Sequence, residues 1–304
     1  MNKIIVTVGP KCNNQESLKE FAKKTNLFRL NGSHGTLDWH RETVNAIRTI
    51  CPEAFILMDI PGIKPRTSNF EDIFIEKEQE VVFGVPPENE KRLNIGLTKK
   101  IPIHDKNLSY FSLNDGQFVF DVVDFGDGYI TGRSRSSFKL LEKKGINLPN
   151  SVYDEVHQFK IYEDFLDKIL DIDIDGLGLS FVQTGDLVDQ IRNVAPNLIL
   201  VAKIENSEGF RNCIDIVNQS DAVMIDRGDL AAEIGFDRLF DSINTISDQT
   251  KAHGKPLIMA TENLETMVDR ELPSKSEVMS IAHSVSVGVD CFMLSEETAT
   301  AESG

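Results

Sequence analysis

Short apolar runs rich in β-branched residues alternate along most of the chain with segments of helical periodicity. The periodic segments predict helices at residues 15–24, 37–50, 187–194 and 239–252. The apolar runs predict eight strands, at residues 4–8, 27–30, 55–59, 176–181, 198–204, 222–225, 256–260 and 291–294. Such alternation is typical of βαβ units with a parallel sheet. Eight strands favour an α/β fold closed into a (β/α)8 TIM-type barrel over the alternative, an open doubly wound sheet.

Residues 67–150 interrupt this alternation. They contain short strand-like runs separated by turn formers such as Asn114-Asp115-Gly116 and Gly126-Asp127-Gly128, with no long helical segment. We therefore expect a small β-rich domain at 67–150, inserted after barrel strand 3. The barrel domain is then discontinuous and consists of residues 1–66 and 151–304. Loops after barrel strands border the active site, so we expect the inserted domain to act as a lid.

Residues 295–304 are all that follows the eighth predicted strand. A complete barrel needs an eighth helix at this point. The pattern leaves two alternatives open: either that helix is missing, or the sequence is a fragment of a longer protein.

The net charge of −16 argues against nucleic acid or an anionic membrane as a partner, because both favour a basic surface. The negative charge does not exclude a phosphorylated substrate, since a few local cations and a divalent metal ion can bind phosphate on an acidic protein. No apolar run reaches the roughly 18 residues needed to span a bilayer. The first residues also lack the features of a signal peptide, so we expect a cytoplasmic protein.

Polar side chains follow the ends of six predicted strands. In a barrel of this type they meet at the C-terminal mouth, where catalytic residues gather. Carboxylates, basic groups and hydroxyls are all present, in segments 29–35, 59–67, 203–206, 226–230, 260–262 and 295–298. Oxygen ligands suit Mg²⁺ or Mn²⁺, and cations neutralise the charge that moves in phosphoryl transfer. The combination predicts a metal-assisted reaction on a phosphorylated carboxylate.

Six motifs, in order from Lys3 to the C-terminus, resemble those of the pyruvate kinase family. A further segment, Lys143-Lys144-Gly145-Ile146-Asn147-Leu148-Pro149, resembles the family's return from the inserted domain to the barrel. The motifs are Ile5-Val6-Thr7-Val8-Gly9-Pro10, Arg29-Leu30-Asn31-x-Ser33-His34-Gly35, Ser180-Phe181-Val182, Lys203-Ile204-Glu205-Asn206-x-Glu208-Gly209, Arg227-Gly228-Asp229-Leu230 and Met293-Leu294-Ser295-x-Glu297-Thr298-Ala299.

The resemblance implies roles for residues of the reacting centre. Glu205 and Asp229 would bind Mg²⁺ or Mn²⁺, and Lys203 would lie at the transferring phosphoryl group and the enolate oxygen. Arg29 would hold phosphate, and the backbone N–H groups of Gly228 and Asp229 would bind the substrate carboxylate. The hydroxyl of Thr261 would lie near the enol carbon. A proton relay would join Thr261 to the other two groups expected to take part, Ser295 and Glu297.

The resemblance also implies a site for a monovalent cation and a site for nucleotide phosphates. The monovalent-cation site of the family corresponds here to Asn31, Ser33, Asp59 and the carbonyl of Ile60. Phosphate or nucleotide contacts are expected from Arg66 and Lys144. Lys64 stands where potassium-dependent members carry a glutamate, so its ammonium is expected to replace K⁺ and to permit activity without added K⁺.

Other positions depart from the family pattern. Asp226 replaces a small residue, Glu262 a glutamine and Glu296 a glycine. Three added carboxylates would repel a nucleotide polyphosphate or alter metal binding, which leaves the phosphoryl acceptor open. The family's C-terminal regulatory domain has no counterpart in this sequence, so a homo-oligomer is expected to form through the barrel.

The leading hypothesis is a kinase that moves the phosphoryl group of phosphoenolpyruvate to ADP, giving pyruvate and ATP. The alternative is an enzyme that forms the same enolate from pyruvate or phosphoenolpyruvate but uses a different acceptor in a specialised pathway. A non-catalytic binding protein is the third hypothesis. Lys203, Glu205 and Asp229 count against it, because a binding module has little use for an enolate-stabilising lysine.

Overall fold

The computed structural model describes residues 3–68, 71–102 and 106–300, and within them eight parallel strands close into a barrel. The strand order around the barrel is β1-β17-β16-β15-β14-β13-β3-β2. The bounds are β1 Lys3–Thr7, β2 Leu27–Asn31, β3 Phe55–Ile60, β13 Gly176–Leu179, β14 Ile199–Ile204, β15 Ala222–Asp226, β16 Leu257–Ala260 and β17 Cys291–Leu294. The (β/α)8 prediction is therefore confirmed. The doubly wound alternative is wrong, because β1 pairs with β17 and closes the sheet.

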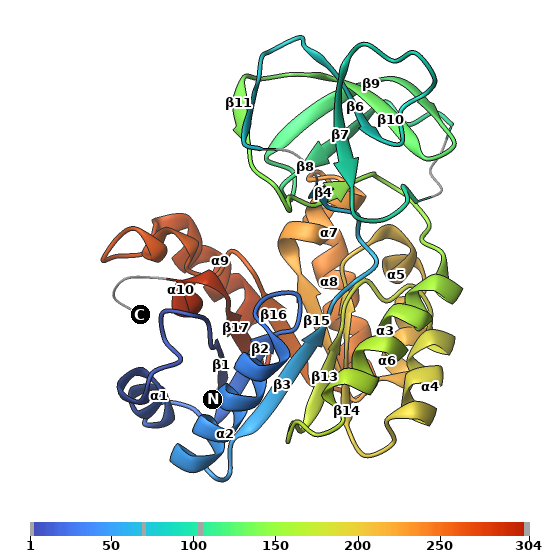
Figure 1. Ribbon diagram of the computed structural model, residues 1–304. Coiled ribbons are helices and arrows are strands. Elements are labelled where there is room, and N and C mark those ends of the chain that lie inside the picture. Colours follow the sequence, from blue (N-terminus) through green and yellow to red (C-terminus); the bar gives the residue numbers. More distant parts are fainter. Residues whose placement is uncertain (1–2, 69–70, 103–105, 301–304) are drawn as a thin grey trace.

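Helices cover the outside of the barrel (Figure 1). They are α1 Gln15–Ala22, α2 Leu37–Ile50, α3 Glu155–Ile169, α4 Gly185–Val194, α5 Ser207–Arg211, α6 Cys213–Gln219, α7 Arg227–Ile234, α8 Leu239–Ala252, the 3₁₀ helix η1 Glu265–Val268, α9 Lys275–Ser286 and α10 Glu296–Ala299. The predicted helices 37–50 and 239–252 match α2 and α8 in both bounds. The fourth strand ends at Leu179, two residues earlier than predicted, and Phe181 has a positive φ of 64°.

The inserted part consists of strands and turns, as predicted (Figure 1). Among the described residues, seven strands form one sheet in the order β12-β8-β9-β10-β6-β7-β4, and β11 pairs with β5. Their bounds are β4 Thr67–Ser68, β5 Ile73–Ile75, β6 Glu80–Gly84, β7 Leu93–Leu97, β8 Tyr110–Leu113, β9 Phe118–Gly126, β10 Tyr129–Ser134, β11 Phe138–Leu140 and β12 Ile146–Asn147. Figure 1 shows this part above one end of the barrel, next to α7. The limits 67–150 of the inserted domain stay a prediction.

Each part has its own apolar core. In the inserted part, Phe83, Phe111 and Phe120 pack with ring centroids 5.2 to 5.5 Å apart, and all three are buried. The main barrel core lies between strands and helices, while a smaller cluster that includes Leu57 and Met224 fills the barrel interior. This arrangement is expected for a TIM barrel, whose interior is packed rather than open.

A glycine in β13 makes room for a polar side chain inside the barrel. A Cβ at Gly178 would collide with Oδ1 of Asp59, on the neighbouring strand β3. The missing side chain lets a carboxylate lie between two strands near their C-terminal ends.

No helix among the described residues is both long enough and apolar enough to cross a membrane.

Candidate active site

Lys203 lies at the end of β14 and is buried among carboxylates. Its Nζ is 2.7 Å from Oε1 of Glu205 and 3.3 Å from Oδ2 of Asp59. Burial lowers the pKa of Lys203, but the surrounding carboxylates, Glu205 first, outweigh this effect and raise it above its usual value. The side chain is therefore a permanent cation in a nearly dry site.

Arg29, on β2, joins this buried ion-pair network through the same oxygen of Asp59 that Lys203 contacts. Its Nη2 and Nε lie 2.7 and 3.2 Å from Oδ2 of Asp59, and its Nη1 donates to Oγ1 of Thr7 at 3.2 Å. Burial raises the pKa of Asp59, yet the charges of Arg29 and Lys203 hold it below its usual range. Asp59 thus joins the two cations that sequence analysis assigned to phosphate and enolate binding.

Three carboxylates at the mouth have a donor set that fits a divalent cation. One oxygen each from Glu205, Asp226 and Asp229 lies within 4.8 Å of the other two. Carboxylate oxygens are hard ligands of the kind that Mg²⁺ and Mn²⁺ prefer. Burial and neighbouring negative charges raise the pKa of both Glu205 and Asp229, although Lys203 and Lys64 respectively oppose this shift. A bound divalent cation would relieve that repulsion.

Residues 1–303 match the protein family described as pyruvate kinase, barrel domain. The chain belongs to the pyruvate kinase family. It is 32% identical to a cytosolic pyruvate kinase isozyme of Glycine max over 314 residues, covering 98% of this chain and 61% of that protein. The pyruvate kinases of Dictyostelium discoideum and Thermococcus litoralis are 31% and 30% identical, covering 99% and 98% of this chain and 62% and 65% of their own length. The chain thus spans about three fifths of the length of the first of these relatives.

Lys64, the residue that departs from the pattern of potassium-dependent pyruvate kinases, connects the inserted part to the barrel. Its Nζ lies 2.6 Å from Oδ1 of Asp115, in the turn between β8 and β9, and it also contacts Oδ1 of Asp229. Burial lowers the pKa of Lys64, but both carboxylates raise it above its usual value. A Cβ at Gly145 would collide with this lysine, so the glycine gives it space.

The predicted equivalents of the monovalent-cation site lie together where β2 and β3 end. Asn31 and Asp59 are opposite each other in the strand register, Ile60 follows Asp59, and the N–H of Ser33 donates to Oδ1 of Asn31 at 3.0 Å. Among the described residues, Lys64 makes no hydrogen bond or ion pair with any of these four. Its ammonium lies instead beside Asp229.

Thr261 occupies a strained turn immediately after β16. Its Oγ1 is 3.0 Å from Oδ1 of Asp226 and 2.8 Å from the carbonyl oxygen of Ala260, and it accepts a hydrogen bond from the N–H of Gly228 at 3.1 Å. The N–H of Gly228, which sequence analysis assigned to the substrate carboxylate, therefore has an internal partner in this structure. Asp226, the N-cap residue of α7, makes no side-chain cap hydrogen bond.

The structure does not bring the predicted proton relay together. Oε2 of Glu297 accepts from the N–H of Ser295 at 2.6 Å, and its Oε1 accepts from the N–H of Leu264 at 3.1 Å. Among the described residues, no hydrogen bond links Thr261 to Ser295 or Glu297. Glu297 is placed to hold two loops, and the relay stays a prediction.

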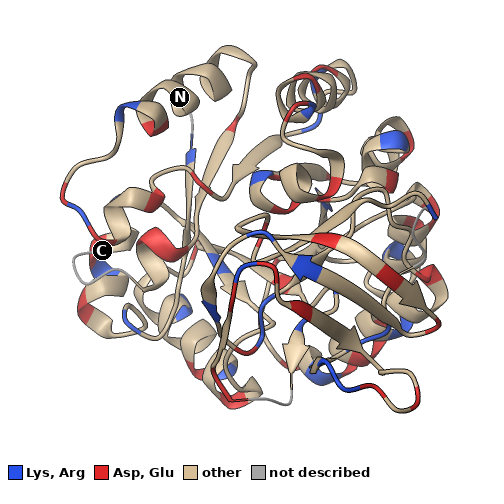
Figure 2. Ribbon diagram, turned by 90° about the horizontal axis from the view of Figure 1, so that it is seen from above, with Lys and Arg blue, Asp and Glu red and all other residues tan. Residues whose placement is uncertain are grey.

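Basic side chains gather where the inserted part joins the barrel. Arg66 is exposed and donates from Nη1 to the carbonyl of Lys143 at 3.1 Å, while Lys144 binds Thr67 through its backbone. Sequence analysis missed Lys99, whose Nζ donates to the carbonyl of Gly62. Burial and the charge of Arg66 lower its pKa to about 8. Figure 2 shows that basic and acidic positions are otherwise interspersed over both parts of the molecule.

Glu233, on α7, was also missed, because a carboxylate in a helix usually indicates a solvated position. It is fully buried, and its Oε1 accepts from Nδ2 of Asn147 at 3.1 Å and from the hydroxyl of Tyr153 at 3.3 Å. Burial raises its pKa to about 8. Glu233 ties the segment that returns from the inserted part to the helix that carries Asp229.

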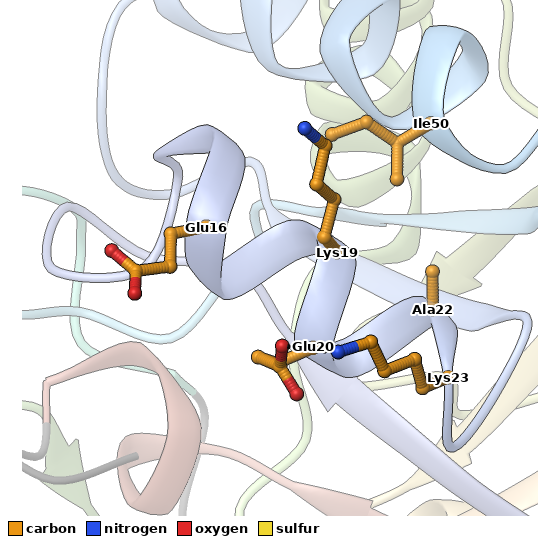
Figure 3. A pocket seen from close by; sticks show the side chains of 6 residues that line it. All are labelled: Glu16, Lys19, Glu20, Ala22, Lys23 and Ile50. Atoms are coloured by element: carbon orange, nitrogen blue, oxygen red, sulfur yellow. Dashed lines mark hydrogen bonds and ion pairs between the residues drawn. The ribbon is translucent and has the colours of Figure 1, made fainter.

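A hollow of about 360 Å³ lies between α1 and α2, away from these residues (Figure 3). Glu16, Lys19, Glu20 and Lys23 of α1 line it together with Ala22 and Ile50. It is open to solvent and offers no convergent set of buried polar groups, so we assign it no function.

Proposed function

We propose that this chain transfers the phosphoryl group of phosphoenolpyruvate to ADP, giving pyruvate and ATP. The observation that carries the proposal is the buried contact between Lys203 and Glu205 at the barrel mouth, beside Asp229. A permanent cation next to a metal-binding carboxylate is what a reaction that develops an enolate needs. Membership of the pyruvate kinase family supports the same chemistry.

Each side chain of the site would have a separate role in that reaction. Glu205 and Asp229 would hold Mg²⁺ or Mn²⁺, which supplies positive charge to the oxygens of the substrate. Lys203 would stabilise the charge that develops on the enolate oxygen as the phosphoryl group departs, because its ammonium is fixed in place before reaction. Arg29 would orient the phosphate, and the N–H groups of Gly228 and Asp229 in the N-terminal turn of α7 would receive the substrate carboxylate in place of the Thr261 hydroxyl.

The nucleotide would bind between the barrel and the inserted part. Arg66 and Lys144 stand at this junction, and Lys99 adds a third cation there. Closure of the inserted part over ADP would exclude water from the transferring phosphoryl group. Division of the chain into a barrel of 1–66 and 151–304 and a lid of 67–150 is part of this proposal.

We further propose that the reaction does not require K⁺, because the ammonium of Lys64 supplies a positive charge beside Asp229. The test is a coupled assay of Mg²⁺-dependent ATP formation in tetramethylammonium buffer, with and without added K⁺. We expect the two rates to agree within about twofold. A strict requirement for K⁺ would contradict this part of the proposal and leave the phosphotransfer intact.

A second candidate is an enolate enzyme with a different phosphoryl acceptor. The exposed Glu262 and Glu296 favour it, since both add negative charge at strand ends that face the mouth. Exchange of the methyl protons of pyruvate for deuterium, observed without any ATP formation from phosphoenolpyruvate and ADP, would support this candidate over the first.

A further inference from the structure

Asp226 is the last residue of β15, and within the described part of the chain only one of its two carboxylate oxygens is hydrogen-bonded. Its Oδ1 accepts the hydroxyl of Thr261 at 3.0 Å. Its Oδ2 is 3.6 Å from Nζ of Lys203, beyond hydrogen-bonding distance, and no other donor reaches it among the residues that the structure describes. The side chain is largely buried, with 11% of its surface exposed at the mouth.

The partners of Lys203 show that Asp226 is not needed to neutralise it. Glu205, at 2.7 Å, and Asp59, at 3.3 Å, already supply two closer carboxylates. Oδ2 of Asp226 is thus the third and most distant carboxylate oxygen of this lysine. A largely buried carboxylate oxygen with so distant a partner is costly unless a stronger positive charge binds it.

The backbone around Thr261 is strained in a way that aims its hydroxyl at Asp226. Thr261 has φ of +58°, an unfavourable conformation for a β-branched residue. The guanidinium of Arg227 holds this turn, because its Nε donates to the carbonyl of Thr261 at 3.1 Å and its Nη2 to Oδ1 of Asn263 at 2.9 Å. Such strain persists where the surroundings enforce it, and here it fixes the orientation of a carboxylate.

We propose that Asp226 is a third carboxylate ligand of the divalent cation, oriented by Thr261. This inference rests on the proposed function, which places the cation at Glu205 and Asp229. One oxygen of each of the three carboxylates already lies within 4.8 Å of the others. Ligand carboxylates are commonly held by a hydrogen bond to their second oxygen, and the Thr261 hydroxyl provides that bond.

The charge of the site agrees with this assignment. The ion pairs at the mouth in which both side chains are largely buried join three cations and four carboxylates, namely Arg29, Lys64, Lys203, Asp59, Glu205, Asp226 and Asp229. Alone they carry one net negative charge, which would repel a phosphorylated carboxylate. A divalent cation changes the net charge to +1, so Asp226 strengthens metal binding while the loaded site still attracts an anionic substrate.

The test measures Mn²⁺ binding by electron paramagnetic resonance on the full chain without substrate. Asp226→Asn keeps the shape of the side chain and an acceptor oxygen for the Thr261 hydroxyl but removes the negative charge. We expect this variant to bind Mn²⁺ at least about tenfold more weakly than the wild type. Thr261→Val should weaken binding severalfold, whereas Thr261→Ser, which keeps the hydroxyl, should bind as the wild type does. Asp189→Asn, which makes the same change at an exposed carboxylate on the outer helix α4, is the control and should change binding less than twofold.

The proposal is overturned if Asp226→Asn binds Mn²⁺ as tightly as the wild type does while Glu205→Gln binds it at least tenfold more weakly. The proposed function would then stand, with a metal site made of two carboxylates. If Glu205→Gln and Asp229→Asn also bind normally, both the inference and the proposed metal site fail. Circular dichroism confirms that each variant is folded. Should Asp226→Asn not fold, the comparison of Thr261→Val with Thr261→Ser decides, and equal affinities overturn the proposal.

Discussion

Lys203 contacts a carboxylate that the proposed metal site would also use. Its ammonium is 2.7 Å from Oε1 of Glu205. In the proposed site the lysine and the metal ion would therefore share one carboxylate. This arrangement makes separate effects on catalysis and on metal affinity measurable at a single residue.

Replacing Lys203 with Met should lower kcat by about a thousandfold, because a preorganised cation at a developing enolate is lost. Mn²⁺ affinity should stay equal or increase, since a competing cation is removed from Glu205. Steady-state kinetics and paramagnetic resonance measure the two effects. Lys139→Met, on the surface of the inserted part, is the control. Retention of more than a tenth of wild-type kcat by Lys203→Met would contradict the assigned role.

Glu233 should make the stability of the protein depend on pH. Its pKa is about 8 in the folded state against 4.5 as the reference value, so the folded state binds more protons than the unfolded state between these values. Its contribution to stability is therefore greatest at low pH and declines as pH rises through this window. The side chain of Glu233→Gln cannot titrate. Between pH 5 and pH 8 the free energy of unfolding of this variant should therefore rise by at least about 1 kcal/mol relative to that of the wild type.

Urea denaturation at the two pH values measures this difference. Glu88→Gln, an exposed position in the inserted part, is the control and should show no pH-dependent difference from the wild type. An equal stability difference between Glu233→Gln and wild type at pH 5 and pH 8 would show that Glu233 does not titrate as described.

At the scale of elements, the turn between β8 and β9 is the part of the inserted domain that reaches into the barrel mouth. Asn114 and Asp115 both have φ of 54° there, and Asp115 pairs with the buried Lys64. A Cβ at Gly116 would touch the ring of Phe236, just beyond α7, so the turn also lies close to that helix. The Lys64–Asp115 ion pair thus holds this turn against the end of the barrel.

Asp115→Asn should loosen this turn. Since the Asp115 side chain is 53% exposed, the ion pair contributes at most about 1 kcal/mol, and we expect amide exchange across residues 110–118 to accelerate severalfold. Hydrogen–deuterium exchange read by mass spectrometry measures the change. Asp127→Asn, in the exposed turn between β9 and β10, should leave exchange in 110–118 unchanged. Equal exchange in both variants would mean that Lys64 does not hold the turn.

At the scale of the whole molecule, the sequence was enough to predict the barrel and the β-rich insertion. The spacing of apolar residues and the residue types of turns are local properties of the sequence. The alternation of strands and helices and the turn at Asn114-Asp115-Gly116 could therefore be predicted from it. Closure through β1 and β17 depends on residues almost 290 positions apart, and only the strand count indicated it. The resemblance in motif order, rather than periodicity, identified the candidate site residues.

The contacts within the site could not be predicted, because they join strand ends that only the closed barrel brings together. Asp226 was expected to repel a nucleotide or to alter metal binding, but its contact with Thr261 and its closeness to Glu205 and Asp229 were not expected. Glu297 was expected to relay protons but binds two backbone N–H groups. Lys64 was expected to replace K⁺, which stays a prediction, and its partner Asp115, 51 residues away, could not be inferred from the sequence.

The fate of the phosphorus atom of phosphoenolpyruvate tests the central claim most directly. The purified chain is incubated with phosphoenolpyruvate, ADP and Mg²⁺, and the reaction is followed by ³¹P nuclear magnetic resonance. The account predicts that the phosphoenolpyruvate signal is replaced by that of the γ-phosphate of ATP, and that Lys203→Met shows no such change. A phosphoenolpyruvate signal that persists, or that moves to inorganic phosphate without ATP, would contradict it.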